Sequence, residues 1–568
     1  MNNSNLHTDM DQTSAAEVND LVNDCRSNVE STFPEGSFQR IFWDEQVKYN
    51  KCKSKSAMRW HPLIVKWALL MKSKSSRAYQ AMKDLGFIHL PSERTLYDYS
   101  HCIESKMGFV PGAVKMLSDE CQAKGMYNSD EPWKSYVGLL QDEIKVKEDL
   151  VFCPSTGQLV GYIHLDETSN VIMDLENQLG RDWRPCHKLP RGYGARTNNK
   201  LEISLGCIQH KGVGAKQINT IMWRSVELLE IDVGVKVLGI TCDGAPQNRA
   251  FFELNRQPDQ PKGEPVNSCH NLYATDDDRH IYFISDVPHL LKTTRNCFAN
   301  SGSHHKTRHL WKDGSDLLWT QIVNLFADKI ENNLYVKSRL TRAHIDLTSF
   351  SQMKVSLAAQ VLSDHVATQL VDEYGEEVSE LAAFIRHMNK WFDCLNTRHL
   401  YEGKDRLNPN ALPFTDPEDP RLAYLSETFL GYFEEWKASV DNRLGRFSRD
   451  ERNKMQLSHQ TLDGLKISVR SFVSCVRFLL EQGAPFVLTA RFNQDVLEQH
   501  FGHYRHKGGS CDNPTIDNVR HTMNVLRTVG STALAPLRGN TKRMSEIDRQ
   551  SLVNTPLACK KSRTASDL

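Results

Sequence analysis

The sequence predicts an α/β fold whose sheet-containing core is interrupted by a mainly α-helical insertion. Between residues 135 and 210, three stretches rich in apolar residues and separated by turn residues indicate antiparallel strands. A helix-patterned stretch and a mostly apolar run, VKVLGITC, follow them and indicate a helix and a buried parallel strand. From about residue 297 to 482, apolar residues recur instead at helical spacing. We therefore expect the core to resume only after this insertion.

The length and composition bound the class of protein. With 568 residues the chain is too long for one hydrophobic core, and about three or four domains are expected. Its 70 basic residues balance its 70 acidic ones, so the net charge indicates no particular partner. The 14 cysteines include no CxxC pair, and the chain has no signal peptide or long apolar run. These features favour reduced thiols in the cytosol or nucleus and argue against a secreted or membrane protein.

An acidic, disordered tail is expected over residues 1–40. Within residues 1–36, five carboxylates, from Asp9 to Asp24, precede the one basic residue, Arg26, and so polar a segment cannot bury enough apolar surface to fold. The first 36 residues contain one cysteine, Cys25, and one histidine, His7. These two side chains cannot make a four-ligand zinc site.

A basic helical segment, residues 41–115, is predicted to bind DNA. Between residues 46 and 83 the chain has ten Lys or Arg residues and no Asp or Glu, which is the charge bias of a phosphate-binding face. Apolar residues from Trp60 to Leu70 recur at helical spacing, and PSERTLYDYSHCI has the pattern of a capped helix. A small helix-turn-helix is predicted here. The alternative is a solvated helical face without a partner.

The first part of the core, residues 125–300, carries two aspartates at strand ends. YVGLLQDEIKV, LVFCPSTGQLVGYIHL and LEISLGCIQH are the predicted antiparallel strands, and residues 166–197, with RGYGART near the end, are predicted to form a loop. Three antiparallel strands, a helix and a parallel strand form the opening of an RNase H-like fold, in which the first strand lies beside the fourth. Asp142 and Asp243 are therefore expected to be neighbours in space.

Three carboxylates, Asp142, Asp243 and Glu498, are predicted to converge at this sheet edge. They would hold two hard divalent cations, the arrangement used for phosphoryl transfer on nucleic acid. Successive strand residues point to opposite faces, so only one of Asp142 and Glu143 can face the metals. Asp286, at the end of IYFISD, rivals Asp243, but the strand order puts it one position further from Asp142. The alternative is that each such aspartate is an ordinary cap or turn residue.

Five ordered blocks of the sequence resemble the P-element transposase family, including its vertebrate THAP-type relatives. The blocks are LLQDEIKVKEDLVFCPSTGQLVGYI, ITCDGAPQNRAFF, YFISDVPHLLKTTRN, WFDCLNTRH and FNQDVLEQHFGHYRHKGG, and the similarity runs from about residue 51 to about residue 515. The resemblance implies a DDE-type transposase with Asp142, Asp243 and Glu498 as catalytic ligands of two Mg²⁺ ions, and it favours Asp142 over Glu143. The zinc finger with which THAP-type members begin is expected to be missing.

The resemblance also implies that the helical insertion, residues 301–482, binds GTP. The family's nucleotide-contacting positions match Asp286, Lys292, Asp393, Asn396 and Asp495. A lysine can meet phosphate and an aspartate can accept from a guanine edge, although the chain has no Walker sequence GxxxxGK[ST]. Asp393 and Asn396 are three apart on a helical pattern and can face one ligand; the alternative is an ordinary polar helix face. No candidate base is evident, so GTP is expected to act without hydrolysis.

The C-terminal part of the core, residues 483–535, supplies the third carboxylate. Asp495 and Glu498 are three apart and share a helix face, so Glu498 can complete the triad while Asp495 leans toward the insertion. The basic residues that follow suit a DNA backbone or are simply solvated: His503, Arg505, His506 and Lys507. Residues 536–568 are polar and expected to be disordered, and CKKSRT is a weak nuclear-localisation signal.

These features predict a nuclear, P-element-like transposase that cuts double-stranded DNA and joins a freed 3′ hydroxyl to a target. Mg²⁺ and GTP are its expected cofactors, and a homo-oligomer on DNA is its expected form. Two other classes stay open. A domesticated, non-catalytic DNA-binding protein would gain nothing from three carboxylates that repel DNA. A protein whose main activity is nucleotide hydrolysis would need a water-positioning residue, and none is identifiable.

Overall fold

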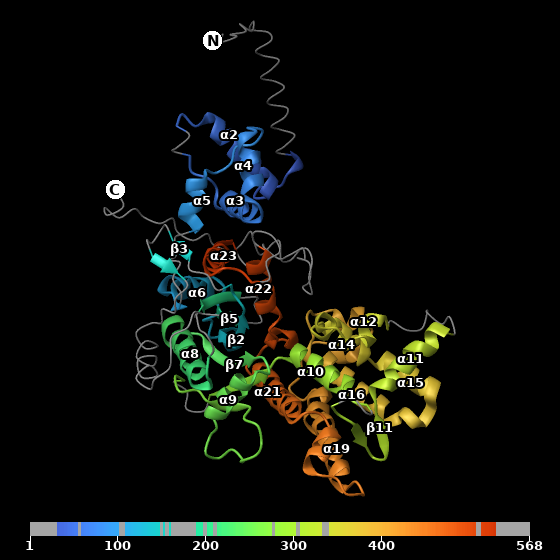
Figure 1. The fold of residues 1–568 in the computed structure, drawn as a ribbon. Coiled ribbons are helices and arrows are strands. Elements are labelled where there is room, and N and C mark those ends of the chain that lie inside the picture. Colours follow the sequence, from blue (N-terminus) through green and yellow to red (C-terminus); the bar gives the residue numbers. More distant parts are fainter. Residues whose placement is uncertain are drawn as a thin grey trace.

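The computed structural model describes residues 31–54, 58–100, 108–147, 151–153, 158–160, 189–196, 202–207, 213–274, 279–302, 307–331, 340–506 and 513–529. Figure 1 shows N-terminal helices above a sheet that is covered by helices, with a large helical region beside it. No helix within these ranges is long and apolar enough to cross a lipid bilayer. Most of the predicted acidic tail and all of the predicted C-terminal tail lie outside the described residues.

Helices form the N-terminal segment, as the apolar spacing predicts. They are α2 (Phe38–Lys51), α3 (Pro62–Lys74), α4 (Ser76–Asp84) and α5 (Glu93–Ser100). Ser37, Ser75 and Ser92 cap three of these helices by accepting a hydrogen bond from the backbone N–H three residues later. The first of these helices begins at Phe38, slightly before the predicted start of the segment.

A mixed, seven-stranded sheet forms the core, with strand order β1-β6-β5-β2-β7-β9-β8. The strands are β1 (Gly108–Phe109), β2 (Tyr136–Ile144), β5 (Leu189–Arg196), β6 (Glu202–Cys207), β7 (Lys236–Cys242), β8 (Ser268–His270) and β9 (His280–Ser285). Strands β2, β5 and β6 pair antiparallel, whereas β7 pairs parallel with both β2 and β9. The predicted placement of the Asp142 strand beside the Asp243 strand is therefore confirmed.

The middle strand of the antiparallel group differs from the prediction. The stretch predicted as that strand contains β3 (Val151–Cys153) and β4 (Gln158–Val160), which within the described ranges pair with each other and not with the seven-stranded sheet. The partner of β2 is instead β5, which contains the RGYGAR that was predicted to be loop. Its glycines and arginines do not favour a strand locally, but ladder hydrogen bonds come from the backbone and are fixed here by pairing with β2 and β6.

Two hydrophobic clusters hold helices against the sheet. One joins the sheet to α6 (Pro111–Ala123), α8 (Ala215–Glu227), the π-helix η3 (Leu228–Val233) and α9 (Pro246–Leu254). The predicted helix before β7 thus ends at Gly234, whose φ of 81° is the left-handed conformation that glycine adopts without strain. The other cluster extends from Leu238 and Ile284 of the sheet into the helical region.

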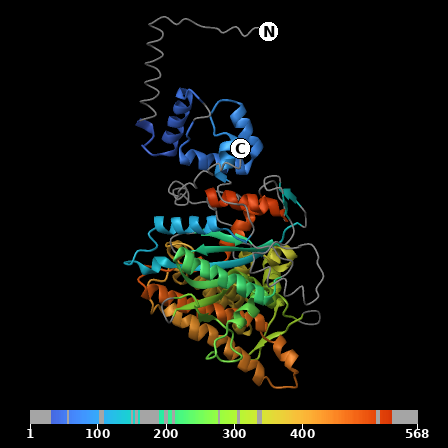
Figure 2. The same cartoon turned by 90° about the vertical axis from the view of Figure 1, so that its left-hand side faces the viewer.

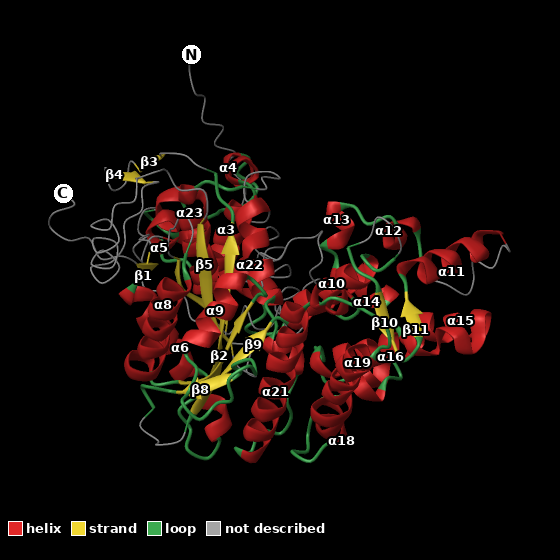
Figure 3. Cartoon of the chain, turned by 60° about the horizontal axis from the view of Figure 1, so that its bottom comes forward, coloured by secondary structure: helices red, strands yellow, loops and turns green. Residues whose placement is uncertain are grey.

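The helical region begins with α10 (Val287–Ala299) and ends with α21 (His459–Glu481). Between them lie α11 (Trp319–Glu331), α12 (Arg342–Ile345), α13 (Ser349–Gln352), α14 (Val355–Val361), α15 (Asp364–Tyr374), α16 (Ser379–Leu395), α17 (Glu402–Asp405), α18 (Pro420–Ala423), α19 (Leu430–Asn442) and α20 (Arg449–Lys454). The region also contains a short hairpin, formed by β10 (Leu310–Lys312) and β11 (Ser315–Leu317). Only helices were predicted in this insertion, and the hairpin was not. Figure 3 shows α21 between the sheet and the rest of this region. Ser471 of α21 bonds the Phe283 carbonyl of β9, which ties the region to the sheet.

The chain then returns to the sheet through a short helix, η7 (Thr489–Phe492), and α22 (Asp495–His506), and ends in α23 (Ile516–Val529). A third hydrophobic cluster joins α22 and α23 to the N-terminal helices and to the end of β2, through residues such as Val65, Ile144, Phe501 and Val519. Figure 2 shows the N-terminal helices directly above α23. The basic segment is therefore packed onto α23, which adjoins the helix that carries Glu498.

Candidate active site

Three aspartates stand level at the carboxyl ends of adjoining parallel strands. The last paired residues of β2 and β7 are Leu140 and Thr241, so Asp142 and Asp243 each lie two residues beyond that pair. Cys242 pairs with Ser285 of β9, so Asp243 and Asp286 each lie one residue beyond theirs. The strand order places Asp243 between the other two aspartates, as the sequence predicts. This edge is where open α/β sheets place their chemistry.

Asp142 lies at a β-bulge near the end of β2 and is half-buried. Burial, followed by the negative charge of Asp243, raises the pKa of Asp142 to about 7, and the charge of Glu498 adds to this rise. The charge of His289 opposes it. Glu143 is exposed, and its backbone N–H donates to Asp142 Oδ1 at 2.7 Å. Of the two residues, Asp142 is thus the one that interacts electrostatically with Asp243 and Glu498. This agrees with the prediction that only one of the two faces the site, since successive strand side chains point to opposite faces.

Asp243 keeps one carboxylate oxygen open. Its Oδ1 accepts from the backbone N–H of Ala245 at 2.9 Å and from Asn248 Nδ2 at 2.5 Å. No hydrogen bond from the described residues reaches its Oδ2. Asn248 is itself buried and accepts from Gln141 Nε2 at 3.0 Å, so the orientation of the Asp243 carboxylate is fixed by a neighbour of Asp142.

Glu498 lies in the first turn of α22. Its backbone N–H donates to the Gln494 carbonyl at 3.1 Å, and its Oε1 lies 4.0 Å from Lys292 Nζ on α10. Its charge reaches Asp142, so the three predicted metal ligands act on the same site electrostatically. Within the described part of the chain, however, no three His, Cys, Asp or Glu side chains are close enough together to hold a metal ion.

The chemistry of this donor set fits a hard divalent cation. All three side chains are carboxylates, which Mg²⁺ prefers over nitrogen and sulfur ligands. Burial is the largest cause of the raised pKa of Asp142, and repulsion from Asp243 and Glu498 adds to it; a bound cation would relieve that repulsion. Among the described residues, each of the three carboxylates has an oxygen that accepts no hydrogen bond: Asp243 Oδ2, Asp142 Oδ2 and both oxygens of Glu498.

Asp286 is buried and engaged at both oxygens. It caps α10, with Oδ2 accepting from the backbone N–H of His289 at 3.0 Å and from His289 Nδ1 at 2.6 Å, while Oδ1 accepts from the Gln494 N–H at 2.8 Å. Burial alone would raise the pKa of Asp286, but its hydrogen bond with His289 and the charge of that residue outweigh burial and lower it. Burial likewise lowers the pKa of His289, but the bond and charge of Asp286 raise it to about 9. The pair is therefore an ion pair at neutral pH.

Asp393 lines a cavity in the helical region. The cavity has a volume of 430 Å³ and is bounded by α10, α14, α15 and α16, with Leu291, Asn389, Phe392 and Arg406 among its lining residues. Asp393 is buried, and it accepts from Asn389 at 2.9 Å, from Asn408 at 2.8 Å and from Arg406 at 3.2 Å. Burial raises the pKa of Asp393 despite these donors.

The other predicted nucleotide residues point elsewhere. Asn396 follows the end of α16, and its Oδ1 accepts from Asn493 Nδ2 at 2.9 Å, away from the residues that line the Asp393 cavity. Lys292 faces Glu498, and Asp495 is half-buried at the start of α22. The structure therefore does not place Asp393 and Asn396 on one cavity wall, because the helix ends between them.

The predicted DNA-contacting residues are only partly accessible. His503 is buried and Arg505 is half-buried, while the His506 side chain and Lys507 lie outside the described part of the structure. In the N-terminal segment, Lys66 is buried and burial lowers its pKa to about 8, against the charge of Glu120. Lys51, Lys53, Arg59 and Arg77 are exposed.

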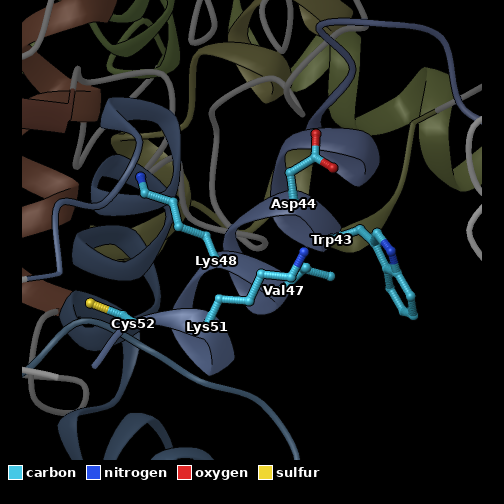
Figure 4. Close-up of a pocket in the computed structure, with 6 residues that line it drawn as sticks. All are labelled: Trp43, Asp44, Val47, Lys48, Lys51 and Cys52. Atoms are coloured by element: carbon cyan, nitrogen blue, oxygen red, sulfur yellow. The ribbon is translucent and has the colours of Figure 1, made fainter. Parts of the chain in front are cut away.

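A shallow surface depression runs along α2. It has a volume of 480 Å³ and is lined by one helix and the residue that follows it: Trp43, Asp44, Val47, Lys48, Lys51 and Cys52. Figure 4 shows these side chains projecting from α2. They form one face of a basic helix, and they assemble no catalytic group.

Sequence reasoning missed four side chains at the strand ends: Gln141, Asn248, His289 and Gln494. His289 has a local signal, because an aspartate three residues before a histidine at a helix start resembles a capping box. The amides have none, since each acts through residues distant in the sequence, with 107 positions between Gln141 and Asn248.

Comparison with known proteins finds similarity over most of the chain. A family model described as TNP-like, GTP-binding insertion domain matches residues 288–407. The transposable element P transposase of Drosophila melanogaster is 23% identical over 499 residues, which are 86% of this chain and 56% of that protein. This chain thus spans about half the length of that relative.

The solved structure of the Drosophila P element transposase strand transfer complex has a similar fold. It matches with a TM-score of 0.65 at 20% identity, covering 87% of this chain and 97% of that one. All three comparisons agree: the family model that matches residues 288–407, the Drosophila relative and the solved structure each show similarity to transposase sequences or folds of the P-element type. The similarity of this chain to the P-element transposase family, which the five ordered sequence blocks indicate, is therefore confirmed.

Proposed function

We propose that the chain is a DDE-type DNA transposase that cleaves DNA and transfers a strand at the edge where β2 and β7 end. The observation that carries the proposal is the level placement of Asp142 and Asp243 on adjoining parallel strands, with the charge of Glu498 acting on Asp142. The strand order β6-β5-β2-β7-β9, antiparallel and then parallel, supports an RNase H-like core. The helical region between β9 and α22 supports an insertion into that core.

Asp142, Asp243 and Glu498 would hold two Mg²⁺ ions in this proposal. When bound, such ions supply activation of the attacking water or 3′ hydroxyl and stabilisation of the leaving oxygen. The protein's own part is to hold the carboxylates: Asn248 and the Ala245 N–H orient Asp243, and the Glu143 N–H orients Asp142. The carboxylate on α22 has to approach the other two, since the described residues hold no close trio.

GTP would bind to the helical region as a cofactor that is not hydrolysed. The match to a GTP-binding insertion domain over residues 288–407 supports this, and the Asp393 cavity has the size of a small-molecule site. Asp393 would accept from the guanine edge, whereas Lys292, Asn396 and Asp495 lie outside the Asp393 cavity and are not part of the proposed pocket. Both carboxylate oxygens of Asp286 accept hydrogen bonds, one from His289 on α10 and one from Gln494 before α22. Asp286 would therefore act by holding α10 and the start of α22 together.

Double-stranded DNA would be the substrate, and the nucleus the place of action. The exposed basic residues of the N-terminal helices are suited to its phosphates, and these helices pack on α23 next to α22. A homo-oligomer on DNA is part of the proposal. The second candidate is a domesticated DNA-binding protein without catalytic activity, which the absence of a close metal-holding trio in the described residues favours.

Nicking of supercoiled plasmid in the presence of Mg²⁺ or Mn²⁺ tests the proposal. Asp243→Asn retains an acceptor for Ala245 and Asn248 but removes the charge, so it should abolish nicking while DNA affinity stays within about twofold. A wild-type protein that binds DNA without nicking it under either metal would favour the domesticated protein. Nicking by Asp243→Asn at the wild-type rate would remove Asp243 from the site.

A further inference from the structure

The segment at residues 492–494 passes the ends of all three parallel strands. Thr241 of β7 donates to the Phe492 carbonyl at 2.8 Å, the Gln494 N–H donates to Asp286 after β9 at 2.8 Å, and Gln494 Nε2 donates to the carbonyl of Gln141 in β2. Gln494 is completely buried. Gln494 thus contacts two of the three strand ends, and Phe492, two residues earlier, contacts the third.

Hydrogen bonds continue from Gln494 to the carboxylates on both sides. Its carbonyl accepts the N–H of Glu498 at 3.1 Å and so forms the first turn of α22. In β2, the residue whose carbonyl it holds is Gln141, which bonds Asn248 and through it Asp243. Asp142 is the next residue of the same strand. Gln494 is therefore linked to Glu498 by one backbone hydrogen bond, to Asp142 through the adjacent Gln141, and to Asp243 through three successive hydrogen bonds, and it touches none of the three carboxylates.

The polar side chain of Gln494 is not explained by packing. Its Oε1 is buried without a hydrogen-bond partner in the described structure, and a buried unsatisfied carbonyl costs about 1–3 kcal/mol. A methionine or leucine would fill the same space without that cost. What the amide provides is the Nε2 donor to β2, at the base of Asp142.

We propose that Gln494 is a positioning residue that fixes Glu498 relative to Asp142 and Asp243. The inference rests on the proposed function of these carboxylates. Outer contacts of this kind typically govern metal affinity by about tenfold to a hundredfold, because they set the direction of the ligands. Loss of the Nε2 donor removes the hydrogen bond between β2 and the residue that starts the first turn of α22. The position of Glu498 relative to Asp142 and Asp243 is then no longer fixed by this contact.

The test compares Gln494→Met with Gln482→Met in the full chain. Methionine keeps the volume and removes the donor, and Gln482 is a half-buried glutamine directly after α21 that provides the matched control. Hydrogen exchange of backbone amides should become about tenfold faster near residues 140–143 and 497–500 in Gln494→Met alone. Its affinity for Mn²⁺ in calorimetry should fall about tenfold, and nicking should recover at saturating Mn²⁺.

Two results would overturn the inference: unchanged exchange at those segments, or changed exchange with wild-type Mn²⁺ affinity, which would make the role one of packing only. Failure of the proposed function is seen separately, in wild-type protein that neither binds Mn²⁺ nor nicks DNA. If Gln494→Met does not fold, as judged by its thermal midpoint, Gln494→Leu has less bulk and is measured in the same way. The same exchange and affinity changes are expected for it.

Discussion

Asp243 and Asp286 stand level at the ends of adjoining strands, yet they differ in what their carboxylates do. Both oxygens of Asp286 accept hydrogen bonds from Gln494 and His289, whereas Asp243 has Oδ2 open among the described residues. Asp286 is also the more buried of the two. An open oxygen is what a metal ligand needs, and a fully bonded carboxylate is what a helix cap needs. The pair thus separates a proposed chemical role from a structural one.

Substituting these two aspartates should therefore have opposite effects. Asp286→Asn cannot satisfy all three of its donors and removes the counter-charge of His289, so it should lower the free energy of unfolding by about 2 kcal/mol. Asp243→Asn relieves repulsion with Asp142 and should leave stability unchanged or slightly higher while it abolishes nicking. Chemical denaturation of both variants without divalent metal measures the difference. Equal destabilisation by the two substitutions would contradict the assignment.

The Asp286–His289 pair should give the fold a defined pH dependence. The pKa of His289 is raised to about 9, so its stabilisation is complete below the ordinary histidine pKa and is lost as pH rises through about 9. The pKa of Asp286 is lowered, so its stabilisation is present above the ordinary aspartate pKa and is lost in acid. Lys292 and Asp142 also face His289 and oppose one another in charge.

Denaturation of wild type and His289→Gln between pH 6 and 9.5 isolates this effect. The stability advantage of wild type should be about 1–2 kcal/mol at pH 6 and should shrink toward pH 9.5, because other groups titrate equally in both proteins. A difference that is constant with pH would show that the two side chains are joined by a neutral hydrogen bond only.

Deleting residues 1–83 would not isolate the contribution of the basic segment to DNA binding. Val65, Ala68, Leu69 and Tyr79 belong to the cluster that holds α22 and α23, so the deletion would remove part of the core together with the charges. Exchanging exposed charges for glutamine avoids this problem. The triple variant Lys51→Gln, Lys53→Gln, Arg59→Gln should weaken DNA binding and reduce the slope of log affinity against log salt by about 2 to 3.

Lys66→Met provides the matched control for that variant. Lys66 is buried, and its pKa is lowered to about 8 by burial, so it is an unfavourable charge in the fold and no phosphate ligand. Its substitution should raise the thermal midpoint and leave the salt slope unchanged. A slope that falls with Lys66→Met and is unaffected by the triple variant would place the DNA elsewhere.

The order of the three strands that end in aspartate was predictable here, whereas the hydrogen bonds of the side chains around them were not. Apolar runs ending in aspartate locate Asp142, Asp243 and Asp286 at one edge, because strand ends in a parallel sheet coincide. Strand β5 was missed because its glycines and arginines do not favour strands and its pairing is supplied by distant partners. The Gln494–Gln141 contact spans 353 positions, and no local pattern encodes it.

In the proposed GTP site, Asp393 would decide nucleotide selectivity. A carboxylate has about four acceptor sites, and Asn389, Asn408 and Arg406 occupy three of them, so about one remains for a ligand. Guanine presents two donors on the relevant edge, its N1–H and its exocyclic amine. Recognition therefore requires one protein donor to leave, and the half-exposed Arg406 guanidinium is the freest to do so.

Calorimetry with GTP and ATP, on wild type, Asp393→Asn and Asp372→Asn, tests this site. Asp393→Asn replaces one acceptor by a donor that faces guanine donors, so GTP affinity should fall at least tenfold, while the exposed Asp372 of α15 is the matched control and should bind as wild type does. Wild type should prefer GTP, because adenine presents a different edge to a carboxylate. Equal affinity for the two nucleotides, or GTP binding that survives in Asp393→Asn, would remove Asp393 from the site. A non-hydrolysable GTP analogue should support strand transfer as GTP does, since no base lies beside Asp393 among its described partners.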